Sequence, residues 1–181
     1  MDINKFIEIY WNYYRQLEGD FFSLEPFCAI DKVNDNAFST KYLHLILSIC
    51  GEIDTICKRM CSCIDPDMDM DTCGINEYKN IMMTHYPKIA DERVVIRKHI
   101  YREVQPWQPW AHKQTPHWWS IYNKVKHHRD ELWNNKEAYK YAMHLIYCLA
   151  SKAVQFRAIH WSSEFMLFVI SQQIHWRYFQ R

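Results

Sequence analysis

The apolar residues that follow Ser39 recur at the spacing of an α-helix, and this stripe constrains the fold more than any other feature of the sequence. Its members are Tyr42, Leu45, Ile46, Ile49, Ile53, Ile56 and Met60. Because an α-helix turns about once every 3.6 residues, these side chains share one face, which must be buried. Ser39 has the hydroxyl that is typical of a helix N-cap. We therefore expect a long helix that begins after Ser39 and ends near Cys63.

Comparable stripes predict helices along most of the remaining chain. The first stripe consists of Ile3, Phe6, Ile7, Tyr10, Tyr14 and Leu17, with Asp2 as the N-cap and Gly19 as the stop signal. Later helices are expected over about 76–86, from Pro116 to about Trp133, over about 134–157 after a cap at Asn134 or Asn135, and over 165–178.

The segments between these helices are few. Residues 21–38 read as a loop with one helical turn, and residues 65–74 read as an acidic connector that precedes the 76–86 helix, which Pro87 closes. Residues 93–110 mix β-branched with polar residues and predict either a strand pair or an extended excursion. The expected fold is all-α: one domain, residues 1–181, forming an up-and-down bundle of four to six helices with one irregular or short β segment near 93–115.

Cysteine usage and the absence of targeting signals bear on the compartment. The seven cysteines are odd in number and lie among apolar neighbours, which is typical of free thiols in a reducing cytoplasm. The N-terminus carries charges throughout and lacks an apolar signal core. The longest apolar run, Phe165 to Ile170, is too short to span a bilayer. We expect a cytoplasmic protein that has no membrane partner.

Charge is distributed unevenly along the chain, although the formal net charge is only +1. Residues 1–92 carry eight Lys or Arg against sixteen Asp or Glu, whereas residues 93–129 carry eight against one. The basic segment also holds four tryptophans, Trp107, Trp110, Trp118 and Trp119. Cations beside aromatic rings favour nucleic-acid binding, because cations contact phosphates and rings stack on bases. The same charge would also allow this segment to dock onto the acidic N-terminal half.

Metal and cofactor sites are not indicated. The cysteines at 50, 57, 61, 63 and 73, with His85, lack the paired spacing of zinc sites. The acidic run from Asp65 to Asp71 lacks the glycine and glutamate that an EF-hand loop requires. Gly-rich phosphate loops, GxSxG elbows and HExxH helices are also absent from the sequence. We expect no metal and no cofactor.

The segment "HWWSIYNKVKHHRD", residues 117–130, combines a core face with a polar face when it is drawn as a helix. Trp118, Ile121, Val125 and Leu132 share the expected core face. Trp119, Asn123, Lys126, His127 and Asp130 share the expected polar face. Asn123 and His127 lie one turn apart beside Lys124, Lys126 and Arg129, so an amide, an imidazole and several cations could reach one phosphate.

The stretch "WWSIYNKVKHHR", preceded by "PWQPW" and by the helix that Ser39 caps, resembles the WWxxYNxxKHxR pattern of small bacterial helical proteins in the HEPN superfamily. The resemblance spans roughly residues 39–160. It implies a four- or five-helix bundle that is often a homodimer. Many such proteins are metal-independent ribonucleases of toxin-antitoxin, abortive-infection or CRISPR systems.

The active motif of that superfamily is an arginine, a polar residue, a few variable residues and a histidine. Asn123 matches the polar position and His127 the histidine, but Tyr122 occupies the arginine position. Arginine would stabilise charge on the transferring phosphate, whereas tyrosine supplies one neutral hydroxyl. Arg129 lies further along and offers a substitute cation. A second match, Arg93 with His99, lies in a segment that reads as extended.

Two hypotheses follow. In one, the protein is a ribonuclease in which His127 is the general acid and base, Asn123 orients the phosphate, and Lys124, Lys126 and Arg129 offset its charge. In the other, which the missing arginine favours, it is a binding module of a bacterial defence or toxin-antitoxin system whose partner is RNA, a nucleotide or an antitoxin-like protein. The expected contact residues for nucleic acid are Arg97, Lys98, Lys113, Trp119, Lys124, Lys126 and His128.

Overall fold

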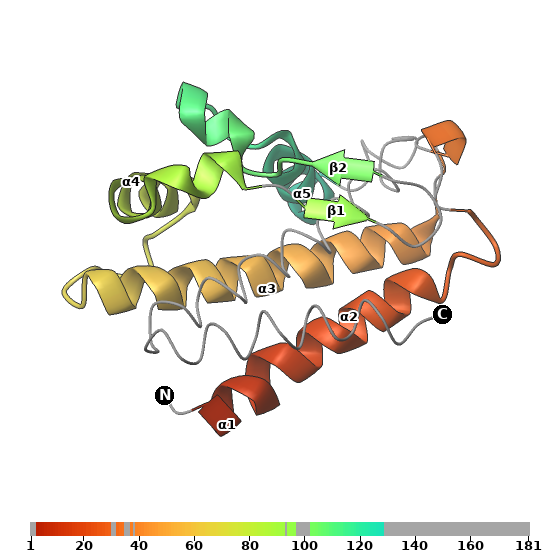
Figure 1. Ribbon diagram of the computed structural model, residues 1–181, viewed down its shortest axis with the longest axis horizontal. Coiled ribbons are helices and arrows are strands. Elements are labelled where there is room, and N and C mark those ends of the chain that lie inside the picture. Colours follow the sequence, from red (N-terminus) through yellow and green to blue (C-terminus); the bar gives the residue numbers. More distant parts are fainter. Residues whose placement is uncertain are drawn as a thin grey trace.

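The computed structural model describes residues 3–29, 32–34, 37, 39–92, 94–96 and 102–128. This part of the chain is helical, as predicted, and carries one short β-hairpin (Figure 1). The α-helices are α1 (Ile3–Phe6), α2 (Asn12–Phe22), α3 (Thr40–Ile64), α4 (Ile75–His85) and α5 (His117–His127). A π-helix, η1 (Ile7–Trp11), joins α1 to α2, and the 3-10 helices are η2 (Lys32–Asn34), η3 (Pro87–Asp91) and η4 (Gln108–His112).

The N-terminal helix packs along α3 and is longer than the sequence predicts (Figure 1). Tyr14 and Leu17 are buried, but the helix continues through Gly19 and ends at Phe22. The expected stop at Gly19 is therefore wrong. Phe21 is only 2% exposed, and burying a phenylalanine contributes about 1.5–3 kcal/mol, which exceeds the cost of about 1 kcal/mol for a helical glycine. Asp2, the expected cap, lies outside the described residues.

Helix α3 confirms the prediction made from its apolar stripe. The Ser39 hydroxyl accepts a hydrogen bond of 3.2 Å from the amide of Tyr42, and the helix ends at Ile64. All seven residues of the predicted stripe are buried. The same helix also buries Cys50, Cys57 and Cys61. It lies between α2 on one side and α4 and α5 on the other, and so forms the centre of the core (Figure 1).

Residues 65–74 form the expected connector, and α4 follows within one residue of its predicted bounds. The Glu77 carboxylate accepts a hydrogen bond of 2.9 Å from the amide of Gly74, which closes the first turn of α4. Pro87 follows the end of α4 and begins η3.

Strands β1 (Val94–Ile96) and β2 (Arg102–Val104) pair antiparallel, with Val94 opposite Val104. Of the two alternatives for this segment, the strand pair is therefore confirmed. After β2 the chain enters η4, and both its N-cap, Trp107, and its own Trp110 are buried. Both tryptophans belong to the hydrophobic core.

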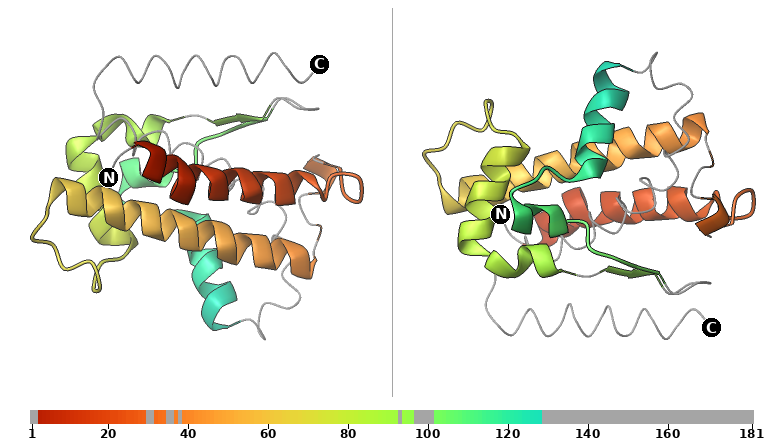
Figure 2. Two further views of the ribbon diagram at one scale, coloured as in Figure 1. Left: turned by 90° about the horizontal axis from the view of Figure 1, so that it is seen from below. Right: turned by 90° about the horizontal axis from the view of Figure 1, so that it is seen from above.

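Helix α5 crosses α3, and its C-terminal end projects beyond that helix (Figure 2). It begins after Pro116, as predicted, but ends at His127, well before the expected end near Trp133. Lys124, Lys126 and His127 lie in its last turn. Cations stabilise the carbonyl end of a helix, so the helix can end at this position although neither glycine nor proline follows. The helices expected over 134–157 and 165–178 lie outside the described residues. Within the described ranges, every helix is too short or too polar to cross a bilayer.

Candidate nucleic-acid interface

A continuous row of aromatic rings fixes the start of α5 against the core. The ring centroids of Trp107 and Trp110 are 4.4 Å apart, and Trp118 lies edge-on to Trp107 at 5.2 Å. The row continues from Trp118 to Trp119 at 5.7 Å and from Trp119 to Tyr122 at 5.2 Å. Each such pair contributes about 0.5–1.5 kcal/mol beyond the area that it buries. The "PWQPW" segment therefore serves to position the helix that carries the polar face.

A buried hydrogen bond fixes the orientation of one indole in this row. The indole nitrogen Nε1 of Trp118 donates to the carbonyl oxygen of Pro106 at 3.0 Å. Proline has no amide hydrogen, so its carbonyl is the only backbone hydrogen-bonding group at that position. Trp118 thus ties the first turn of α5 to the end of the hairpin segment.

The core face of α5 is wider than the sequence predicts. Trp118, Ile121 and Val125 are buried as expected. Trp119 and Tyr122 are buried too, at 7% and 8% exposed, so the expected place of Trp119 on the polar face is wrong. Trp118 and Trp119 are adjacent in sequence and both contact the aromatic row. Adjacent residues of a helix point in different directions, so both can be buried only if the buried face is wider than a single stripe. The Trp119 ring is consequently not available to stack on a base.

The remaining surface of α5 is strongly polar. His117 is exposed at the start of the helix, and the exposed residues of its last turns and C-cap are Asn123, Lys124, Lys126, His127 and His128. No acidic residue belongs to this helix, so its two lysines, which lie beside two histidines, set the charge of its last turns. Asn123 and His127 lie one turn apart on this surface, as predicted. We call these five residues the basic end of α5.

Tyr122 lies at the border between the aromatic row and the basic end. Burial raises the pKa of its phenol, and Cys50 and Asp54 raise it further. The hydroxyl is therefore neutral at physiological pH and cannot replace the positive charge of an arginine. The ammonium of Lys126 lies 5.7 Å from the centroid of the Tyr122 ring, at the distance of a cation–π contact. Lys126 is nevertheless exposed.

The other expected contact residues are not gathered at the basic end of α5 in the described part of the chain. Lys113 is exposed at the end of η4, a different element. Arg97, Lys98 and Arg129 lie outside the described residues, as do Arg93 and His99 of the second motif match. Asp130 and Leu132 also lie outside them.

The cysteines and the acidic connector are arranged as structural residues. Cys50, Cys57 and Cys61 are buried in the core, whereas Cys63 is exposed. Asp69 uses its carboxylate locally, accepting from the amide of Asp71 at 3.0 Å and from the hydroxyl of Thr72 at 3.1 Å. Within the described ranges, no three His, Cys, Asp or Glu side chains lie close enough together to hold a metal ion.

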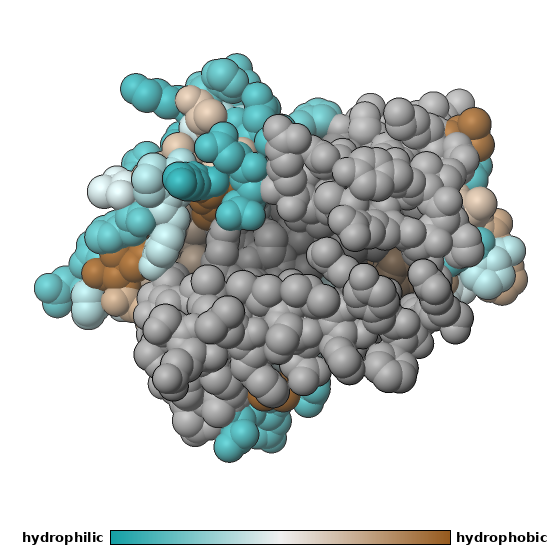
Figure 3. Space-filling model, viewed as in Figure 1, coloured by the Kyte–Doolittle hydropathy of each residue, from teal (hydrophilic) through white to brown (hydrophobic). Residues whose placement is uncertain are grey.

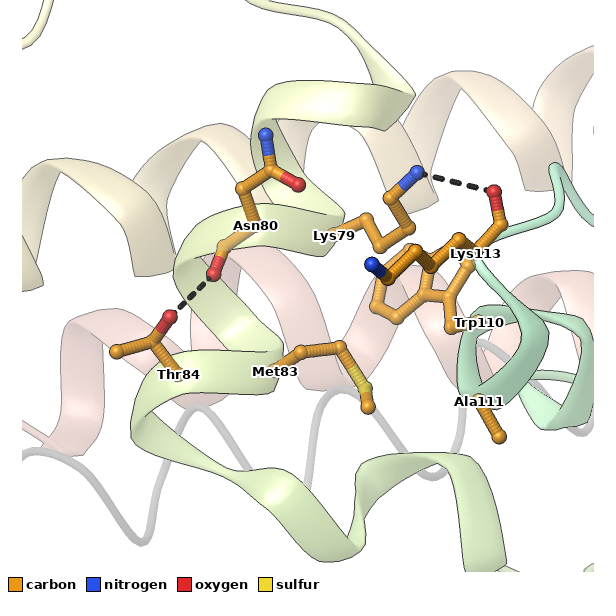
Figure 4. Close-up of a pocket in the computed structure, with 7 residues that line it drawn as sticks. All are labelled: Lys79, Asn80, Met83, Thr84, Trp110, Ala111 and Lys113. Carbon is orange, nitrogen blue, oxygen red and sulfur yellow. Dashed lines mark hydrogen bonds between the residues drawn. The ribbon is translucent and has the colours of Figure 1, made fainter.

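Sequence reasoning missed a second polar surface. Helix α4 and the end of η4 border an open hollow of about 590 Å³ (Figure 4). Its described lining residues are Lys79, Asn80, Met83, Thr84, Trp110, Ala111 and Lys113. The spacing of 79, 80, 83 and 84 places these residues on one face of α4, which was a usable signal. The contribution of η4 could not be seen without the fold, because the two elements are far apart in sequence.

Comparison with known proteins adds no relative, since no protein-family model, curated protein or solved structure matches the chain.

Proposed function

We propose that the protein is a nucleic-acid-binding module that contacts the phosphates of RNA through the basic end of α5. The observation that carries this proposal is the exposure of Lys124, Lys126, His127 and His128 together at the projecting end of one helix. Lysine side chains in this arrangement neutralise phosphates, and Asn123 and the imidazole N–H groups can donate to phosphate oxygens. The HEPN resemblance supports the same reading and extends it to a bacterial defence or toxin-antitoxin role.

The burial of Trp119 and Tyr122 defines the mode of binding that we propose. With these rings in the core, the basic end of α5 offers cations, an amide and two small imidazole rings, but no tryptophan or tyrosine face for a base. Contacts to phosphates carry no sequence information by themselves. We therefore expect binding that depends steeply on salt and only weakly on RNA sequence.

Fluorescence anisotropy with a labelled single-stranded RNA at several salt concentrations tests the proposal. Each phosphate contact to a single strand contributes about 0.7 to the slope of log affinity against log salt. The double variant Lys124→Gln with Lys126→Gln should lower that slope by about 1 to 1.5. The matched control, Lys41→Gln with Lys88→Gln, removes two exposed lysines on α3 and η3 and should keep the slope of the unaltered protein. Equal slopes for the two double variants would refute the proposed surface.

Ribonuclease activity is the second candidate, because Asn123 and His127 are both exposed one turn apart. In this reading His127 moves the proton of a ribose hydroxyl, and a homodimer would face two such motifs toward each other. The buried, neutral Tyr122 argues against it, since no cation stands at the arginine position. RNA cleavage at neutral pH in EDTA that is lost in His127→Ala, with unchanged helical circular dichroism, would replace the binding proposal with this one.

A further inference from the structure

The hollow between α4 and η4 is lined by two lysines that come from different elements. Lys79 belongs to α4, and Lys113 follows η4 (Figure 4). The hollow also presents the polar side chains of Asn80 and Thr84, and none of its described lining residues is acidic. The surface around α4 and η4 is largely hydrophilic (Figure 3). Two ammonium groups without a lining carboxylate favour an anionic ligand.

Lys79 is held in place by the backbone of the opposite wall. Its ammonium donates to the carbonyl oxygen of Lys113 at 3.3 Å and lies 3.5 Å from Oδ1 of Asn76. An ammonium has three hydrogens, so one donor remains for a ligand when both of these acceptors are engaged. The bond to Lys113 also links the two walls of the hollow and fixes where the charge of Lys79 lies (Figure 4).

Lys113 has a backbone conformation that lysine rarely adopts. Its φ of 58° and ψ of 19° are left-handed, and the amides of Lys113 and Gln114 donate to the carbonyls of Trp110 and Pro109. This is the hydrogen-bond pattern that usually ends a helix at glycine, because glycine adopts the conformation without cost. A side chain that persists at such a position is a reason to look for function there. Here the side chain adds a second lysine to the lining of the hollow.

We propose that this hollow binds a phosphate monoester, with Lys79 and Lys113 on the phosphate and Asn80 and Thr84 as polar contacts. A phosphate monoester has three terminal oxygens and up to two negative charges, which suits two cations and two neutral polar groups. The hollow of about 590 Å³ falls within the range of small-molecule sites and exceeds what a bare phosphate needs. Met83 and Ala111 provide apolar wall for the attached organic group. The basic end of α5 contributes nothing to this site, so the inference does not depend on the proposed function.

Isothermal titration calorimetry with adenosine 5′-monophosphate as the probe tests the site in the full-length protein. We expect binding of the nucleotide, competition by inorganic phosphate, and no binding of adenosine. An RNA trinucleotide with and without a 5′-phosphate distinguishes a free nucleotide from an RNA end as the source of the monoester. Adenosine binding as tightly as its monophosphate, or no binding of the monophosphate at millimolar concentration, would overturn the proposal.

Two variants separate ligand binding from folding. Lys113→Gly removes the ammonium but keeps the carbonyl that holds Lys79, and glycine suits the left-handed backbone, so the melting temperature should not fall. Its affinity for the monophosphate should drop about tenfold, as for the loss of one charge-assisted hydrogen bond. Lys41→Gln, the control for charge, should bind as the unaltered protein does, and so should the α5 double variant. Unchanged affinity in Lys113→Gly would show that the hollow is not the site.

Discussion

The hydroxyl of Tyr78 donates a hydrogen bond of 2.7 Å to Oδ1 of Asp54, and this bond joins α4 to α3. The other carboxylate oxygen of Asp54 pairs with the ammonium of Lys58 at 3.2 Å. Tyr78 is fully buried, and its hydroxyl also lies 3.0 Å from the carbonyl of Cys73. Burial and the neighbouring Asp54 carboxylate raise the pKa of the Tyr78 phenol. The phenol therefore remains a hydrogen-bond donor over the whole physiological range.

Tyr78→Phe should lower the free energy of unfolding by about 1–3 kcal/mol, because it leaves the acceptors of this buried hydroxyl without their donor. Urea unfolding followed by circular dichroism measures the change. A double-mutant cycle with Asp54→Ala, which removes the acceptor, should give a coupling of about 0.5–3 kcal/mol, since the two groups are in contact. Additive effects of the two substitutions would contradict the assignment of this bond as the tie between α3 and α4.

Trp118→Phe should destabilise the protein more than Trp119→Phe does, by about 1–2 kcal/mol. Both indoles are buried in the same aromatic row, so the two substitutions remove similar packing. Only the first also removes the donor of the 3.0 Å bond to the carbonyl of Pro106. Chemical denaturation of the two variants side by side measures the difference. Equal losses would mean that the row holds α5 by packing alone.

Glu52 should make stability depend on pH. Burial raises the pKa of its carboxyl from the ordinary 4.5 to about 7. Between these values the folded chain holds a proton that the unfolded chain has released, so stability from this group is present below pH 4.5 and is lost as the pH rises toward 7. Because the side chain is only partly buried, solvent screening limits the loss to about 1 kcal/mol. Glu52→Gln should therefore be more stable than the unaltered protein at pH 8 and not at pH 4, as measured by unfolding at both values. The same difference at both pH values would exclude Glu52 as the cause.

Ser39→Ala should cost about 1 kcal/mol of stability, because it removes the acceptor of the Tyr42 amide at the start of α3. Ser48→Ala is the matched control within the same helix. The Ser48 hydroxyl donates to the carbonyl of His44 in the helix interior, where alanine is the better helix former. The control should thus be neutral or slightly stabilising. Thermal unfolding of both variants checks the opposite signs, and a loss in the control as large as in Ser39→Ala would remove capping as the explanation.

The elements that could be predicted are those whose sequence signal lies within the element itself. Helix α3 was predicted almost to the residue, because its period and its cap both lie within the element. The end of α2 was not predicted correctly. The free energy gained by burying Phe21 against the core exceeds the cost of keeping Gly19 in the helix. The face of α5 was predicted for Trp118 but not for Trp119, whose burial depends on tryptophans that precede the helix.

The site residues divide in the same way. The exposure of Asn123, Lys126 and His127 follows from helical spacing, so the basic end of α5 could be predicted. The hollow could not, because Lys79 and Lys113 meet only after α4 and η4 have packed together. Tyr78 and Asp54 likewise come from two helices, and no spacing within either one indicates their bond.

The row of tryptophans holds only one end of α5, and this has a consequence for how the helix moves. Trp118 is tied into the core, whereas the last turn ends in exposed His127 and His128, and the amide of His128 donates to the carbonyl of Lys124. Val125 is the one buried side chain of that turn, so opening it exposes little apolar surface, and its amides should exchange with solvent faster than those near Trp118. The N-terminal end of α5 is thus held rigidly against the core, whereas its C-terminal end, which carries the lysines, opens more easily.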